Sequence, residues 1–210
     1  MRCTAVVLLK APRPGTVKTR LAVTHGDAFA LRVYRALAQR QLAAVPTNWQ
    51  TLVAFAPGNA DAEMRAWLGP EMALVPQPVG DLGSRICGGL EAALAGDAEA
   101  VFALGADCPA LTRPRLQLAA RALRTHDAVL GPATDGGYYL LGMKQVDKAL
   151  FQKVAWSTSS VAAETRQRLR ALRWQWAELP TEDDVDDAES LARVEAAGLF
   201  EPHLTKSPVN

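Results

Sequence analysis

Short apolar runs alternate with longer amphipathic stretches along most of this chain. The apolar runs are bounded by Gly, Pro or polar residues and lack a polar face, which is typical of strands buried on both sides. Strands are expected at residues 3–9, 51–56, 73–75, 101–104, 127–130, 138–143 and 174–179. Helices are expected at residues 27–44, 60–68, from the turn-rich segment 77–85 to 95, 112–124, 161–172 and 188–197. This alternation predicts an α/β protein with a mainly parallel sheet.

The chain shows no internal repeat and no convincing linker between domains. We therefore expect a single domain over residues 1–200, followed by a loose polar tail at residues 201–210. The hydrophobic share of 49% in 210 residues is ample for a core. No stretch is long enough to span a membrane or to form the core of a signal peptide, so we expect a cytoplasmic protein.

The charges nearly cancel, with 23 basic and 22 acidic residues and a net charge of +1. This balance gives no bulk attraction to nucleic acid or to an acidic membrane, so neither is expected as a partner. Any binding of phosphate must come from the local placement of charge. The oligomeric state stays open, a homodimer included.

Asp107 stands directly after the apolar run Val101–Leu104 and Gly105. Ligands of open α/β sheets lie just beyond the carboxyl ends of the strands, so this carboxylate is placed where a ligand is expected. One reading is a helix cap for the helix that begins near Thr112. The other is a ligand of Mg²⁺ or Mn²⁺, which take one or two carboxylates together with substrate phosphates.

The segment KAPRPGTVKTR follows the first expected strand and carries four cations. A loop between a buried strand and a helix binds anions well through its free backbone N–H groups. The segment matches neither the P-loop nor the G-x-G-x-x-G pattern, and a basic loop can also be plain solvated surface. The candidate phosphate-binding residues here are Lys10, Gly15, Lys18 and Arg20, whereas Arg13 reads as surface charge.

Two further segments contain carboxylates that could join the same site. Asp135, Gly136 and Gly137 follow the strand at residues 127–130, where a structural tight turn is the alternative reading. The acidic run EDDVDD could be a solvated face, but its alternation places Asp184 and Asp186 on one side of an extended segment. One of the two could join Asp107 on a metal, and the sequence leaves open which one.

Trp156 precedes a helix and could either stack on a base or sugar or fill the core. The three histidines are scattered without metal-ligand spacing, and no Ser/His/Asp set is visible. Nucleophilic hydrolysis therefore has no support in the sequence.

Six segments in register resemble a family of small bacterial GT-A-like glycosyltransferases, associated by name with radical-SAM and selenoprotein neighbours and in some cases with arsenosugar biosynthesis. They are KAPRPGTVKTRL, GDLGSRI, LGADCPAL, HDAVLGPATDGGYYLLG, WST and DVDDAESL, and they run from residue 10 to about residue 191. The family looks related to the nucleotidyltransferases that build nucleotide sugars. The chain lacks the glycine-rich GxGxR loop of those nucleotidyltransferases, and it has a lone Asp107 in place of the DxD of many glycosyltransferases.

The resemblance implies a nucleotide-diphospho-sugar transferase (GT-A, Rossmann-like) fold, three-layer α/β/α with one antiparallel strand. It implies that Asp107 and Asp186 hold Mg²⁺ or Mn²⁺, that Lys18 and Arg20 bind nucleotide phosphates, and that Gly136 and Gly137 line the acceptor side. We add Arg85 as a further candidate for phosphate binding and Trp156 as a further candidate for the acceptor side. Asp135 is a candidate general base for an acceptor hydroxyl.

The leading functional hypothesis is metal-dependent transfer of a sugar from a nucleotide-sugar donor to a small acceptor. The first alternative is a nucleotidyltransferase that joins an NTP to a phosphorylated small molecule and releases pyrophosphate. The second alternative, from a different class, is a nucleotide-binding protein without turnover.

Overall fold

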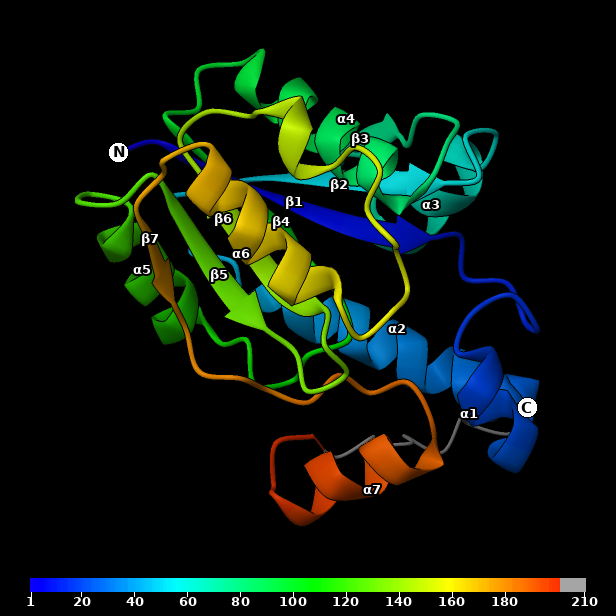
Figure 1. Ribbon diagram of the computed structural model, residues 1–210. Helices are drawn as coiled ribbons and strands as arrows, with labels where there is room; N and C mark the ends of the chain where they lie inside the picture. Colours follow the sequence, from blue (N-terminus) through cyan, green and yellow to red (C-terminus); the bar gives the residue numbers. More distant parts are fainter. Residues whose placement is uncertain (201–210) are drawn as a thin grey trace.

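The computed structural model describes residues 1–200, so the tail expected at residues 201–210 lies outside the described residues. Its strands are β1 (Cys3–Lys10), β2 (Gln50–Ala56), β3 (Ala73–Pro76), β4 (Ala100–Leu104), β5 (Ala128–Pro132), β6 (Tyr138–Met143) and β7 (Trp176–Glu178). They form a seven-stranded sheet in the order β3-β2-β1-β4-β6-β5-β7 (Figure 1).

Strand β6 runs against its two neighbours, pairing antiparallel with both β4 and β5. The other pairs of neighbouring strands are parallel. The expected mainly parallel sheet with one antiparallel strand is therefore confirmed. Because β6 is reversed, its first residues lie at the same edge of the sheet as the last residues of β1 and β4.

Helices cover both faces of this sheet (Figure 1). They are α1 (Thr19–His25), α2 (Asp27–Ala44), α3 (Asp61–Leu68), α4 (Leu82–Leu94), α5 (Arg113–Ala122), α6 (Val161–Ala171) and α7 (Ala188–Ala196), with a short 3₁₀ helix at Lys148–Leu150. Tyr34 of α2 and Leu116 of α5 share one buried cluster, whereas Leu90 of α4 and Leu169 of α6 share another. The expected three-layer α/β/α arrangement is confirmed.

Strand β1 shows why the central strands are apolar throughout. Its Ala5, Val7 and Leu9 belong to the cluster under α2 and α5, and Val6 belongs to the cluster under α4. Successive side chains of a strand point to opposite faces, so a strand covered on both sides has no position for a solvated residue.

The loop expected over residues 10–20 is wrong at both ends. Lys10 is the last residue of β1, and Arg20 lies inside α1, a helix that was not expected. Gly26, with a φ of 81°, separates α1 from α2. Helices α1 and α7 pack on α2 through a third buried cluster that includes Leu21, Val33 and Leu191.

None of the helices between residues 1 and 200 combines the length and the apolar composition that crossing a membrane requires.

Candidate active site

Lys18 and Asp107 lie together at the carboxyl edge of the sheet. Lys18 follows β1 and Asp107 follows β4, and these two strands are direct neighbours. The Lys18 Nζ lies 2.7 Å from Asp107 Oδ1, which is the length of a strong charge-assisted contact. The structure therefore brings the cationic loop and the strand-end carboxylate into one site.

The acidic segment after β7 folds back to the same place. Val185 is fully buried, and its N–H donates a hydrogen bond to the Asp107 carbonyl oxygen at 2.9 Å. With Val185 anchored, Asp186 points its Oδ1 to within 3.1 Å of the Lys18 Nζ. Two carboxylates from distant parts of the chain thus converge on one ammonium group.

Lys18 is held in an unusual position for a charged side chain, with only 4% of it exposed. Desolvation by itself would lower the pKa of Lys18, but the charges of Asp107 and Asp186 outweigh it and hold the pKa above its ordinary value. The backbone of Lys18 lies in the left-handed region, at φ 49° and ψ 43°, immediately before α1. Non-glycine residues adopt this conformation at a cost of about 1–2 kcal/mol, so the surrounding contacts must enforce it.

Two contacts fix the loop that carries Lys18. The Tyr34 hydroxyl donates to the Lys10 carbonyl and accepts from the Lys10 N–H. These two hydrogen bonds connect α2 to the end of β1. Val17 is buried in the core cluster beneath the loop. Gly15, with a φ of 74°, makes the turn between these two anchors. The sequence does not mark Tyr34 as a site residue, because its position in the helix is typical of a core residue.

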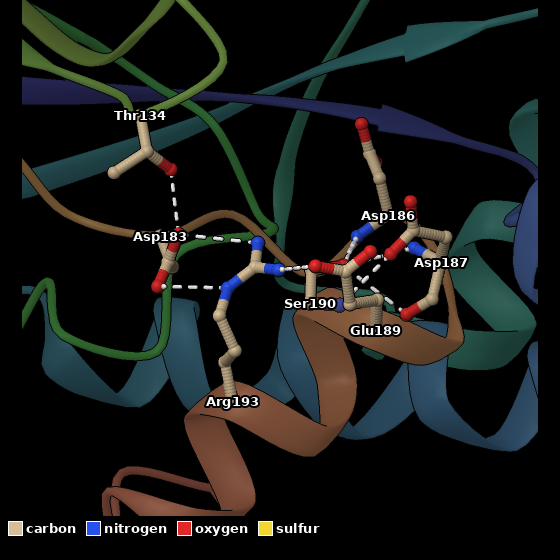
Figure 2. A network of polar contacts seen from close by, with 7 residues as sticks. All are labelled: Thr134, Asp183, Asp186, Asp187, Glu189, Ser190 and Arg193. Atoms are coloured by element: carbon tan, nitrogen blue, oxygen red, sulfur yellow. Dashed lines mark hydrogen bonds and ion pairs between the residues drawn. The ribbon is translucent and has the colours of Figure 1, made fainter.

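A capping network holds the acidic segment at the start of α7 (Figure 2). The Asp187 carboxylate accepts from the Ser190 N–H at 2.8 Å, and the Ser190 hydroxyl accepts from the Asp186 and Asp187 N–H groups. Asp183 accepts a hydrogen bond from the Thr134 hydroxyl, which joins the segment to the loop after β5. In Figure 2 the side chain of Asp186 points away from this network, so its carboxylate stays available to the site.

Asp184 is the most perturbed carboxyl of the site. Burial, reinforced by the negative charges of Asp107 and Asp135, raises the pKa of Asp184 to about 8. Its Oδ1 is buried and has no hydrogen-bond partner. Asp184 therefore holds a proton near neutral pH, whereas the contact to Lys18 is made by Asp186.

A polar cavity of about 500 Å³ opens beside these groups. It is lined by Arg20, Thr134, Asp135, Asp183, Asp184, Asp186, Asp187, Ser190 and Arg193. A larger groove of about 650 Å³ lies at the opposite edge, among strand-start residues such as Gln50 and Ala73. Among residues 1–200, Glu71 is the one charged residue that lines it. Because open α/β sheets bind ligands at their carboxyl edge, the smaller cavity is the candidate substrate site.

Three of the other candidate residues make contacts outside this cluster. The Arg85 guanidinium donates to the Gly80 carbonyl within its own loop. Trp156 packs against Gly83 at the start of α4, where a Cβ would lie 2.6 Å from its indole ring. Lys10 is exposed at the end of β1. The structure thus brings Lys18 together with Asp107 and Asp186, but it does not bring these three residues into contact with them.

Gly136 is expected to be far less tolerant of substitution than its neighbour Gly137. The φ of Gly136 is 88°, and a Cβ there would lie 2.1 Å from the Ser159 carbonyl oxygen, whereas at Gly137 the nearest atom is the Asp135 Oδ1 at 3.1 Å. We expect Gly136→Ala to lower the free energy of unfolding by about 2 kcal/mol or more, and Gly137→Ala by clearly less. Urea unfolding of both variants measures this, and equal losses would contradict the close packing at Ser159.

The carboxylate pair fits part of a divalent-metal shell. Within residues 1–200, no group of three or more His, Cys, Asp or Glu side chains is arranged to hold a metal ion. Asp107 and Asp186 nevertheless direct one oxygen each at a single cation, the Lys18 ammonium. Since Mg²⁺ is commonly bound by one or two carboxylates plus substrate phosphates and water, two such ligands are a sufficient protein contribution.

A family model described as an uncharacterized protein conserved in bacteria (DUF2064) matches residues 36–158. A protein from Desulfovibrio desulfuricans G20, provisionally assigned as a nucleotide-diphospho-sugar transferase, has a structure similar to this one, with a TM-score of 0.89 and 30% sequence identity. That match covers 99% of this chain and 92% of the other. No curated protein sequence matches.

More distant solved structures share the fold. Rv0371c from Mycobacterium tuberculosis H37Rv, in complex with manganese, has a TM-score of 0.58 at 15% identity, over 92% of this chain and 98% of that one. The 4-diphosphocytidyl-2C-methyl-D-erythritol synthase from Anaerococcus prevotii DSM 20548 has a TM-score of 0.59 at 11% identity, over 95% and 99%. The nucleotide-diphospho-sugar transferase fold expected from the sequence is thereby confirmed.

Proposed function

The chain belongs to the DUF2064 family, and from that premise we propose that it is a transferase acting on a nucleotide-activated substrate, with a nucleotide sugar as donor. The observation that carries the proposal is the convergence of Asp107, Asp186 and Lys18 at the carboxyl edge of the sheet. Such a site offers carboxylates for a divalent metal ion and an ammonium group for a diphosphate, the two charged species that take part in the reaction. We assign this activity to one domain formed by residues 1–200.

Asp107 and Asp186 would hold the metal, either Mg²⁺ or Mn²⁺. The manganese complex of Rv0371c supports a divalent ion in this fold. When bound, the ion would supply Lewis-acid stabilisation of charge on the departing diphosphate. The buried Val185 keeps the Asp186 backbone fixed beside Asp107, so the two carboxylates are preorganised for this task.

Lys18 and Arg20 are the proposed diphosphate ligands, with Gly15, Lys10 and Arg85 as further candidates along the nucleotide. Lys18 is already beside the carboxylates, and Arg20 lines the adjoining cavity from the first turn of α1. A guanidinium can grip two phosphate oxygens at once, while the flexible lysine offers a compact charge. Negative charge forming on the leaving diphosphate would be stabilised by both.

The acceptor would enter through the cavity that Asp135 and Asp184 line. Gly136 and Gly137, which follow Asp135, and Trp156, which lies outside the cavity lining, stay proposed acceptor-side residues. In sugar transfer, the acceptor oxygen bonds to the anomeric carbon, the bond from that carbon to the diphosphate breaks, and the hydroxyl proton passes to a base. Asp135 is the proposed base, because its carboxylate is already fixed by the Gly137 N–H at 2.8 Å. The carboxylates that line this cavity favour an unphosphorylated acceptor over a phosphate monoester.

Nucleotidyl transfer is the second candidate, because the fold is shared with a cytidylyltransferase from Leptospira borgpetersenii. The two reactions differ in what they release: sugar transfer releases a nucleoside diphosphate, and nucleotidyl transfer releases pyrophosphate. A thermal-shift screen of nucleotides and nucleotide sugars, with and without Mn²⁺, identifies the ligand, and product analysis then separates the reactions. Nucleotide binding without any product would instead indicate a binding protein.

Lys18→Ala should weaken the binding of a nucleoside diphosphate more than that of the matching nucleoside. Loss of one buried cation next to the phosphates is expected to reduce affinity roughly tenfold to a hundredfold. Calorimetry with both ligands measures the difference. Arg13→Ala is the matched control, because Arg13 lies in the same loop but pairs with Glu63 at the surface. Equal weakening of nucleoside and diphosphate would place Lys18 outside the phosphate site.

A further inference from the structure

The Lys18 ammonium has its two hydrogen-bonding partners on the Asp107 and Asp186 carboxylates. The distances to the two Oδ1 atoms are 2.7 Å and 3.1 Å, so these atoms are separated by no more than the sum of the two. Lys18 is 4% exposed, whereas Asp107 and Asp186 are 36% and 46% exposed. The carboxylates therefore face the solvent, and the cation that pairs with both of them lies beneath.

A metal at this site draws on the same two carboxylates. A divalent ion between Asp107 and Asp186 would lie within a few ångströms of the ammonium, and like charges at such a distance in a poorly solvated site repel strongly. Each carboxylate keeps a second oxygen for an ion, but the ammonium and the ion then share the same two negative charges, and one oxygen of each carboxylate is already aimed at the Lys18 Nζ. Binding of the metal therefore weakens the hold of the carboxylates on the lysine and favours its release.

We propose that Lys18 is a displaceable counter-ion that couples metal binding to diphosphate binding. Without ligands its single positive charge balances one of the two negative charges of Asp107 and Asp186. When the metal takes the carboxylates, the ammonium loses its counter-charge in a place that water scarcely reaches, and a diphosphate supplies a new one. Each ligand then raises the affinity of the other, as linkage requires. This inference rests on the proposed metal site and adds the order and cooperativity of binding.

The coupling predicts that the protein binds metal weakly when no diphosphate is present. It also predicts that removing the Lys18 ammonium increases the metal affinity. We would titrate metal-free full-length protein with Mn²⁺ alone and measure free Mn²⁺ by electron paramagnetic resonance. Lys18→Met should bind Mn²⁺ about tenfold more tightly than the wild type, in the range of typical coupling factors. Arg13→Met makes the same change in net charge in the same loop and should stay close to the wild type. Lys18→Arg keeps the cation and should also bind weakly.

The outcomes separate the coupling from the proposed function. Unchanged or weaker Mn²⁺ binding by Lys18→Met, with Asp107→Asn still abolishing it, overturns the coupling and leaves the metal site standing. Tighter binding that disappears in Lys18→Met combined with Asp186→Asn supports the coupling, even if the protein transfers no sugar. Circular dichroism checks that each variant is folded, and Lys18→Gln replaces Lys18→Met if the latter is not.

Discussion

Asp107→Asn is expected to abolish Mn²⁺-dependent nucleotide binding while lowering the melting temperature by no more than a few degrees. An amide is a poor ligand for a hard divalent cation, so the metal loses one of two protein carboxylates. The fold is spared because Asp107 is partly exposed, and Lys18 keeps Asp186 as its ionic partner. Calorimetric titration of the nucleotide with and without Mn²⁺, alongside thermal unfolding, measures both effects.

Asp183→Asn is the matched control for Asp107→Asn. Asp183 belongs to the same acidic segment and lines the same cavity, but it is bound to Thr134 and Arg193, not to Lys18. Its replacement should leave the metal dependence intact. Undiminished Mn²⁺-dependent binding in Asp107→Asn, or equal loss in both variants, would remove Asp107 from the metal site.

The layered fold was predictable because the sequence of each central strand indicates that the strand is buried on both faces. Strands β1 and β4 are apolar at nearly every position, as covering by helices on both faces demands. Helix α1 was not predictable in the same way. It is seven residues long, and Leu21 is its one buried residue, so it has no apolar stripe to read. Its position depends instead on packing against α2 and α7.

The proximity of Lys18 and Asp107 could be predicted, because each follows a parallel strand and the carboxyl ends of such strands lie at one edge of the sheet. The arrangement of the residues around them could not. Alternation placed Asp184 and Asp186 on one side with Val185 opposite, and Val185 is indeed buried. The same alternation cannot say that Asp186 reaches Lys18 while the Asp184 Oδ1 is buried without a partner. That difference arises from where α7 begins, since the Asp187 cap fixes the direction of the segment.

Asp184→Asn is expected to make the metal-free protein more stable, by an amount that grows as the pH rises. The pKa of Asp184 is about 8 in the fold because of burial and the nearby Asp107 and Asp135 charges, and about 3.9 in an unfolded chain. Between these values the folded state binds a proton that the unfolded state does not, so wild-type stability falls with rising pH. Asparagine does not ionise, so the variant lacks this slope.

The difference in unfolding free energy between Asp184→Asn and the wild type should therefore increase by up to about 1.4 kcal/mol per pH unit between about pH 5 and pH 8. Urea unfolding in EDTA across this range measures it. Asp183→Asn is a control in which the pKa shift has the opposite direction, because the Thr134 hydrogen bond lowers the pKa of Asp183. The ionised Asp183 carboxylate therefore adds to the free energy of unfolding at neutral pH, and this contribution is lost only in acid. Its curve should run parallel to the wild type above about pH 5. A parallel curve for Asp184→Asn as well would mean that Asp184 is ionised in the folded protein, with its charge compensated by the Lys18 ammonium.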